Sequence, residues 1–497
     1  MPVLHALSSR TVRVFSAVAA AAAVVCGLPE PSVAQNPSAD TPVELQETGT
    51  FGMGARPLGM GRAYRAVGED VTTIAYNPAG LAQIRQIEFS VGLAHDSQDR
   101  LLSRSGSFTT ERTNTRLEHL ALAYPYPAYR GSLVLAFAFH RRSDLDLDLF
   151  MRGVVEPPML NPFDPRERFG VVEFEDIVQE GMINAWTGAV AWDFAPNLAF
   201  GASVSLLTGS RSETITLARG IPDPSAGDCP DQTPDENGLY YGCGGDFESD
   251  LFKSLVLRDA DLTGFTGSVG VLARLEGGFR LAGAVELPRW LEYDGSEFVR
   301  TEDFIDIVES DILFQDDVTL PLTLSGGASW SRRGLLLAAD AVWTDWKQID
   351  FEGDIRAPDR SFAYRSTVSF NLGAEVQIPD QPLRVRGGFF REPIPYELIA
   401  ADMQVGLLPG DDGVIGTNDD IPVVERFYPE AAIASDRKFF TLGAGVLIQS
   451  GLAIDVAYQH GSWERTTAAG YEPPGGAATR EEVTENRMFL TATAHFE

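Results

Sequence analysis

Segments of about ten residues with alternating apolar and polar side chains recur from Gln86 to the end of the chain. The clearest runs from Thr367 to Ile378, where every second residue is apolar: Val368, Phe370, Leu372, Ala374, Val376 and Ile378. A period of two is typical of a β-strand with two different faces and excludes a helix. The sequence therefore predicts an all-β fold for this part.

The connections between these segments alternate in length. Short ones lie at 125–131, 194–198, 276–279, 331–335, 379–383 and 449–452, and long acidic ones near 96–114, 144–180, 212–263, 294–317, 348–361, 397–436 and 461–484. Short turns at one rim, long loops at the other and an even strand count are typical of bacterial outer-membrane barrels. Because a soluble sandwich lacks this asymmetry, we predict a fourteen-stranded antiparallel transmembrane β-barrel over 86–497 with long extracellular loops.

The ends of the segments agree with a membrane location. Aromatic side chains that suit the two membrane interfaces lie near them: Tyr124, Tyr126, Trp192, Phe194, Trp290, Tyr293, Trp343, Trp346 and Trp463. The last segment, Glu485 to Phe496, resembles the aromatic-ended final strand of outer-membrane barrels, although Glu497 follows Phe496.

The first residues have the character of an export signal. Arg10 and Arg13 precede an apolar run, and Ser32-Val33-Ala34 offers a cleavage site, so residues 1–34 are predicted to be a signal peptide. The residues before Cys26 lack the small side chain of a lipoprotein signal. Outside the signal no run is long enough for a membrane-spanning helix, so a membrane would be crossed by strands.

The stretch from Phe51 to Ile84 is the one long part without strand alternation. Its glycines allow a tightly turning backbone, Met60 to Val67 is predicted to form a short helix, and Asn77-Pro78 is predicted to open a turn. We interpret residues 35–85 as a compact N-terminal hatch inside the barrel lumen.

Charge and cysteines narrow the possible partners. A net charge of -31, from 70 acidic and 39 basic residues, argues against nucleic-acid binding. Cys229 and Cys243 lie in a loop-like stretch of an exported chain and are predicted to form a disulfide. One loop has oxygen-bearing residues that could hold a structural calcium ion, or could be an ordinary acidic loop: Asp411, Asp412, Asn418, Asp419 and Asp420. No other cofactor is expected.

Two motifs together resemble the FadL/TodX family of outer-membrane transporters for long-chain fatty acids and aromatic hydrocarbons. The first is Gly59-Met60-Gly61-Arg62-Ala63 with Asn77-Pro78-Ala79 in the hatch, and the second is 434–443, ASDRKFFTLG. The resemblance implies a monomeric passive transporter in the outer membrane whose hatch blocks the lumen. A hydrophobic ligand would be captured by extracellular loops and released sideways through the wall.

Apolar residues in two long connections are candidates for ligand capture, although they could equally pack the loops together. They are Leu239, Tyr240, Phe247 and Phe252 in the first, and Phe304, Ile307, Val308 and Phe314 in the second. The spacing in Asp303 to Phe314 also predicts a short amphipathic helix over the mouth.

Charged residues on the polar strand faces are predicted to point into the lumen: Arg280, Glu286, Asp340, Glu375, Arg384, Arg386 and Asp455. They would either hold the hatch through ion pairs or, for Arg384 and Arg386, bind the carboxylate of a fatty acid. The family's third strand carries a kink that opens the wall, but Leu133 to His140 contains neither Gly nor Pro. The exit route is therefore left open.

Two other classes of function were weighed. An enzyme is disfavoured because the few histidines of the mature chain lie outside any Gly-x-Ser-x-Gly setting. A barrel that serves protein secretion or binds protein is the alternative, since such barrels carry a similar hatch motif but need no apolar route.

Overall fold

The computed structural model of the chain describes residues 52–103, 107–127, 131–161, 164–222, 247–303, 307–353, 362–398, 403–408, 421–426, 433–434, 436–448, 451–467 and 479–496. These residues belong to one compact unit, assigned to Asn36–Glu497. None of the helices within these ranges is long and apolar enough to cross a membrane. The predicted signal peptide, the Cys229–Cys243 disulfide and the acidic loop 411–420 lie outside the described residues.

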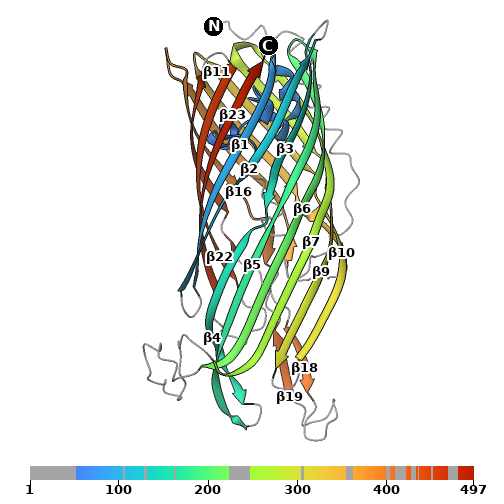
Figure 1. Ribbon diagram of the computed structural model, residues 1–497, viewed down its shortest axis with the longest axis vertical. Helices are drawn as coiled ribbons and strands as arrows, with labels where there is room; N and C mark the ends of the chain where they lie inside the picture. The colour runs from blue at the N-terminus through green and yellow to red at the C-terminus, as the bar shows by residue number, and fades with distance from the viewer. Residues whose placement is uncertain are drawn as a thin grey trace, which may run out of the picture. The chain divides into compact units, whose positions relative to one another are not determined.

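The wall is a closed antiparallel barrel (Figure 1). Its strands are β1 Ile87–Ser103, β2 Ser107–Tyr126, β3 Leu133–Asp144, β4 Leu147–Asn161, β5 Asp164–Ala195, β6 Leu198–Pro222, β7 Phe247–Arg274, β8 Phe279–Glu286, β9 Arg289–Asp303, β10 Ile307–Leu320, β11 Thr323–Arg332, β12 Leu335–Asp345, β13 Asp350–Gly353, β15 Ser366–Gln377, β16 Leu383–Glu392, β20 Ile433–Ala434, β21 Arg437–Ile448, β22 Leu452–Thr467 and β23 Thr479–Phe496. β14 Phe362–Tyr364 pairs with β17 Tyr396–Leu398 in a separate two-stranded sheet. β1 pairs with β23 from Ile87↔Phe496 to Ser103↔Arg480 and closes the ring.

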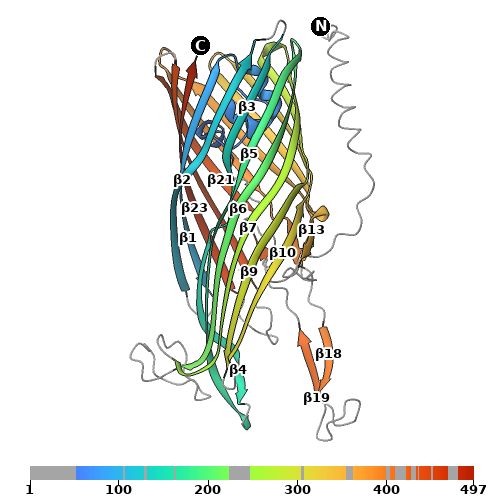
Figure 2. The ribbon, with the colours of Figure 1, turned by 45° about the vertical axis from the view of Figure 1, so that its right-hand side comes forward.

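Several of these strands are pieces of one longer wall strand. β3 and β4, β8 and β9, β10 and β11, and β12 and β13 each follow one another along the barrel after a short break. Counted this way the barrel has fourteen strands, which confirms the predicted fold class. A separate hairpin, β18 Met403–Leu408 with β19 Ile421–Arg426, lies at the end away from the short turns (Figure 2).

The prediction of long loops was wrong for much of their length. The connection expected at 96–114 is the paired end of β1 and start of β2, and the one expected at 294–317 is β9 paired with β10. The amphipathic helix predicted for Asp303 to Phe314 is also wrong, because β10 begins at Ile307. Polar strands can extend beyond the membrane as a ladder, since their backbone groups pair with each other whatever the side chains.

A band of apolar side chains covers the outer face near the short turns. Exposed members include Phe89, Leu122, Phe137, Val204, Phe370, Leu372 and Leu490. On β15 the alternate residues Thr367, Asn371 and Glu375 are buried. The predicted register is therefore confirmed: the apolar face points outward, as a lipid environment requires, and the polar face points inward. Three predicted interface residues, Tyr293, Trp346 and Trp463, are instead buried inside, because they pack against inward aromatic and apolar neighbours.

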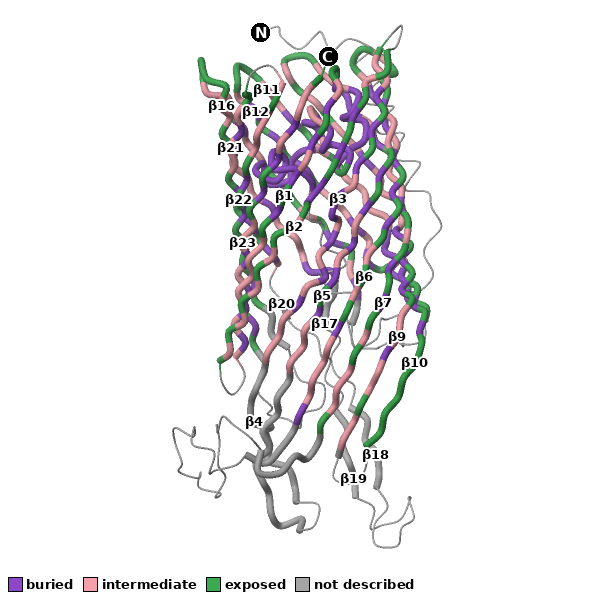
Figure 3. Tube along the Cα trace, in the orientation of Figure 1, coloured by how far each residue is buried: buried purple, intermediate pink, exposed green. Residues whose placement is uncertain are grey.

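The segment Gly52–Gln86, hereafter the luminal segment, lies inside the ring near the short turns (Figures 1 and 2). It contains the helix α3 Ala55–Gly59 and the 3-10 helices η1 Val71–Ala75 and η2 Pro78–Gln83. The helix predicted for Met60 to Val67 is wrong, because Gly61 and Arg62 both have positive φ and interrupt it. Most of the segment is buried (Figure 3).

Candidate functional site

Ion pairs join the luminal segment to the inner wall. Glu375 on β15 lies 2.9 Å from the Arg56 guanidinium and 2.6 Å from that of Arg386, which also pairs with Asp455. Arg280 on β8 lies 2.9 Å from Glu69. These contacts confirm the predicted inward orientation of the wall residues. Removing one partner of such a buried pair costs on the order of 3–5 kcal/mol, so the network holds the segment in place.

Hydrogen bonds from backbone N–H groups anchor the same segment around the ring. The backbone N–H groups of Gly54, Ala55 and Gly61 donate to Glu118, Thr491 and Thr441, at 2.9, 2.9 and 3.0 Å. The Asp340 carboxylate accepts from the backbone N–H of Tyr64 at 2.8 Å. Because partners come from strands far apart in the barrel, the segment is fixed from several sides.

Wall glycines let the backbone of the luminal segment come close. A Cβ added at Gly388 would lie 2.3 Å from the nitrogen of Gly61, and one added at Gly270 would lie 1.9 Å from Oδ1 of Asn77. No side chain fits at such distances. The inner wall is therefore shaped to receive this segment, a feature that strand alternation alone does not reveal.

The hatch motif residues take specific structural roles. Asn77 caps η2, since its side chain accepts a hydrogen bond from Ala79 N–H, and Pro78 occupies the first helical position. This confirms the predicted turn. Gly59 and Gly61 both bond to the Thr441 hydroxyl.

Arg62 connects the hatch motif to the second predicted motif region. Its guanidinium carbon lies 4.1 Å from the ring centroid of Phe390, and it pairs with Glu392. Arg437 of the 434–443 motif lies 3.3 Å from the same carboxylate. Phe390 and Glu392 could not be predicted as partners, because contacts between distant strands depend on the closed ring.

The Glu69 carboxylate of the luminal segment responds to both burial and neighbouring charge. Burial opposes its ionisation, but the guanidinium groups of Arg56 and Arg280 outweigh burial and lower the pKa of Glu69 below its usual range. The charged form of Glu69 is therefore part of the anchored state.

An apolar cluster lines the lumen between the luminal segment and the long-loop end. Its members are buried side chains from several strands: Leu145, Ile183, Ala185, Leu207, Ala260, Leu262, Leu291, Tyr293, Phe314, Val318, Leu320, Trp346, Ile349, Phe351, Tyr364 and Ile394. Among the predicted capture residues whose side chains are described, Phe314 belongs to it, whereas Ile307 and Val308 do not. The other members were missed because the inward face of each strand was expected to be polar, whereas here it is apolar and outward neighbours such as Asp259, Asp261 and Gln315 are polar and exposed.

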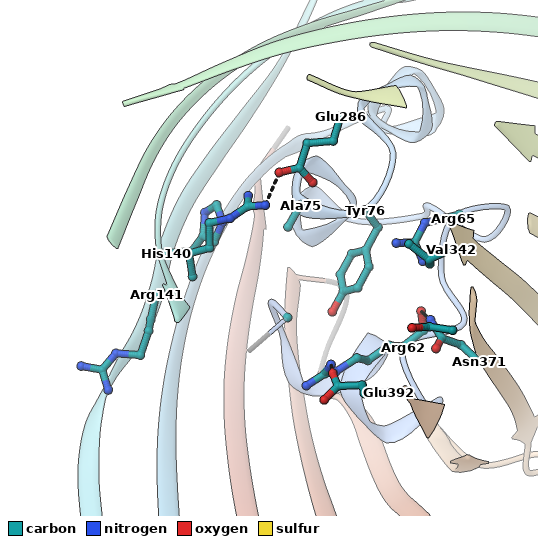
Figure 4. Close-up of a pocket in the computed structure, with 13 residues that line it drawn as sticks. Arg62, Arg65, Ala75, Tyr76, His140, Arg141, Glu286, Val342, Asn371 and Glu392 are labelled. Carbon is teal, nitrogen blue, oxygen red and sulfur yellow. Dashed lines mark hydrogen bonds and ion pairs between the residues drawn. The ribbon is translucent and has the colours of Figure 1, made fainter. Parts of the chain in front are cut away.

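A polar cavity of about 120 Å³ lies beside the luminal segment (Figure 4). It is lined by Arg62, Arg65 and Tyr76 of the segment and by wall residues that include His140 and Glu286. Figure 4 shows these side chains around the Tyr76 ring. The lumen therefore combines an apolar region with a charged one.

The wall is interrupted on one side of β3. Backbone pairing of β2 with β3 runs from Tyr126↔Leu133 to His119↔His140 and continues no further among the described residues. Beyond that point β2 pairs with β1, and β4 pairs with β5. We call the interval between 107–118 of β2 and 141–150 of β3 and β4 the wall gap.

The break in β3 needs neither Gly nor Pro. The register with β5 shifts between Arg141 and Ser143, and β3 ends at Asp144. Leu145 is buried in the apolar cluster, and the Asp146 carboxylate accepts a hydrogen bond from Gly181 N–H at 2.9 Å. A β-bulge and the Asp146 hydrogen bond thus interrupt the strand just after Leu133 to His140, without Gly or Pro.

The wall gap begins next to a second bulge. The pairing of β1 with β2 shifts at Gly92, which leaves Glu118 as the extra residue. His119 hydrogen-bonds to the Ser90 hydroxyl through Nε2 at 2.8 Å and to Glu118 through Nδ1. All three side chains are fully buried or nearly so. Because Glu118 also accepts from Gly54, this network links the luminal segment to the edge of the gap.

The structure places the remaining predicted ligand residues apart from one another. Ile307 and Val308 are exposed on β10, and Arg384 is paired with Gln377 and lies 3.6 Å from Glu375. Phe247 and Phe252 begin β7, but their side chains are not described. Leu239, Tyr240 and Phe304 lie outside the described residues. Carboxylate binding by Arg384 and Arg386 stays a prediction.

Comparison with known proteins gives a result at the level of structure. No family model matches the sequence, and no curated protein sequence is significantly similar. A FadL homologue from Pseudomonas aeruginosa superimposes with a TM-score of 0.58 at 15% identity, covering 94% of this chain and 100% of that one. The chain has the FadL-type barrel fold.

Other FadL-type barrels are structurally similar to this chain as well. The toluene transporter TodX from Pseudomonas putida gives a TM-score of 0.55 at 14% identity, covering 90% of this chain and 99% of that one. The toluene transporter TbuX from Ralstonia pickettii gives 0.50 at 14% identity, covering 90% and 100%. At these identities the likeness shows the fold, and the function has to be argued from the site.

Proposed function

We propose that this chain is a passive outer-membrane channel for hydrophobic small molecules of the kind represented by hydrocarbons or long-chain fatty acids. The ligand enters at the long-loop end, moves along the apolar cluster, and leaves sideways through the wall gap. The luminal segment acts as the hatch that closes the axial path.

The observation that carries this proposal is the position of the wall gap. Outward side chains of β2 are apolar from Leu117 to Tyr126 and polar at Thr109, Glu111 and Thr113. The gap therefore lies at the edge of the apolar band, on the side of the long loops. An apolar molecule that leaves there meets the lipid interface without crossing the anchored luminal segment, and burial out of water drives that step.

The described lumen supports a route for apolar solutes. Leu145 belongs to the apolar cluster and also stands at the break of β3, so the cluster reaches the gap. The toluene transporters TodX and TbuX share this fold, and toluene is an apolar solute that suits such a route. A protein-binding barrel would need no apolar surface that ends at an opening in its wall.

Transport is testable with the purified protein in liposomes. The protein should accelerate uptake of toluene, of a long-chain fatty acid, or of both, into vesicles, and ligand should be detected by mass spectrometry after purification. Uptake of a polar sugar of similar mass is the control and should stay at the level of empty vesicles. Equal rates for apolar solutes with and without protein would contradict the proposal.

A further inference from the structure

The wall gap is crossed by side chains where backbone pairing is missing. Arg112 of β2 lies 3.1 Å from the Asp146 carboxylate and donates to the carbonyl oxygen of Gln179 at 3.0 Å. Arg116 lies 3.2 Å from Asp144 and also pairs with Asp146. Arg112 also donates to the carbonyl oxygen of Leu147 at 3.3 Å and lies 3.6 Å from Glu180. Carboxylate and carbonyl partners on the far side thus hold both guanidinium groups of β2.

Neutral contacts extend the same bridge along the gap. The Asn114 amide donates to Asp146 at 2.7 Å, and the Thr110 hydroxyl donates to the carbonyl oxygen of Asp148 at 3.0 Å. Thr110, Arg112, Asn114 and Arg116 are alternate residues, so all four project from one face of β2. A ladder of side chains therefore replaces the backbone ladder over this interval.

Such a ladder differs from a backbone ladder in how it opens. A paired strand separates only with loss of many backbone bonds, whereas ion pairs between partly exposed side chains exchange readily with water. Side-chain exposure here is 16% for Arg112, 22% for Arg116 and 6% for Asp146. The ion pairs are buried enough to keep the gap closed, and the arginines are exposed enough for water to replace Asp144 and Asp146 as their partners.

We propose that Arg112 and Arg116, paired with Asp144 and Asp146, form an electrostatic latch that closes the wall gap and opens to let the ligand out. The role of the latch in ligand release rests on the proposed function, whereas its contacts are observed independently of that function. Asp146 is its centre, because both arginines, Asn114 and the Gly181 N–H all contact that one carboxylate.

The test measures the width of the gap directly. Spin labels are placed at Thr113 and Ser210, exposed positions on β2 and β6 on either side of the gap, in a background with Cys229→Ser and Cys243→Ser. In the double variant Arg112→Gln with Arg116→Gln, the mean distance between labels should grow by at least one strand spacing, about 4.8 Å. Asp146→Asn should give the same change, which guards against misfolding of the double variant.

A matched control uses an ion pair in an intact part of the wall. Arg258 on β7 lies 3.2 Å from Glu213 on β6 and pairs with Glu297 on β9, where backbone ladders are continuous. Arg258→Gln should leave the distance between the labels unchanged. An unchanged distance in both latch variants would overturn the proposal.

A transport readout separates the latch from the proposed function. Uptake of a hydrophobic probe into proteoliposomes should rise severalfold in the latch variants and stay at the wild-type rate in Arg258→Gln. A wider gap in proteins that move no apolar probe at all would support the latch and contradict the proposed function. An unchanged gap with faster probe uptake would overturn the latch and leave the proposed function standing.

Discussion

At the residue scale the close contact between the luminal segment and the wall depends on glycines of the wall, which have no side chain. Gly388 and Gly270 leave space for the backbone near Gly61 and Asn77. The sequence showed that the hatch is rich in glycine, but it did not show that glycines of the wall face it. That information depends on which strand positions lie opposite the segment in the closed ring.

Gly388→Ala should displace the luminal segment. The new methyl group would overlap Met60 and Gly61, and overpacking of this kind costs about 1–3 kcal/mol. Hydrogen exchange should be faster in residues 52–84 of the variant. The control is Gly188→Ala on β5, where an added Cβ has no atom within 4 Å. Equal exchange in both variants and the wild type would contradict the close approach.

The charge of Glu69 makes the anchoring depend on pH. The pKa of Glu69 is lower in the folded state than the unfolded value of about 4.3. The ionised carboxylate therefore stabilises the anchored state at pH values above about 4.3, and this stabilisation is lost as the pH falls through the folded pKa. Protection of the luminal segment from hydrogen exchange, corrected for intrinsic rates, should therefore weaken below about pH 4. Glu69→Gln should reduce protection at pH 7 and flatten this dependence. Exposed Glu352→Gln should keep the wild-type profile, and a flat wild-type profile would count against the assignment.

At the element scale the strands differ from simple alternation in two ways. They continue as polar ladders where loops were expected, as β9 and β10 show, and in parts of them the apolar side chains lie on the inward face. Alternation found their membrane-spanning parts because lipid requires an apolar outer face. It could not locate the break in β3, because a bulge and the Asp146 side chain cause it without Gly or Pro.

The two faces of β10 should respond differently to truncation. Phe314 is 7% exposed within the apolar cluster, and its neighbour Leu313 is 84% exposed. Phe314→Ala should lower the free energy of unfolding by about 3–5 kcal/mol through the cavity left behind, measured by denaturant unfolding in detergent. Leu313→Ala should change it by less than about 0.5 kcal/mol. Similar losses in both variants would contradict the inward assignment of Phe314.

At the scale of the whole molecule, the fourteen strands, their outward register and the inward charges could be predicted from the sequence, because each follows from a local pattern. Ion-pair partners such as Glu375 with Arg56 are 319 residues apart, and pairing at that distance is set only when the ring closes. The apolar cluster and the wall gap likewise exist only in the closed barrel. Their combination with an anchored luminal segment is what suggests a sideways path.

A photoreactive hydrocarbon tests that path most directly. The protein in liposomes would be exposed to a diazirine-bearing alkane, irradiated, digested and sequenced by mass spectrometry. The proposed route predicts labels in the apolar cluster and on both edges of the wall gap, 107–118 and 141–150. Labels at the short-turn end beyond the luminal segment, with none at the gap, would contradict a lateral exit.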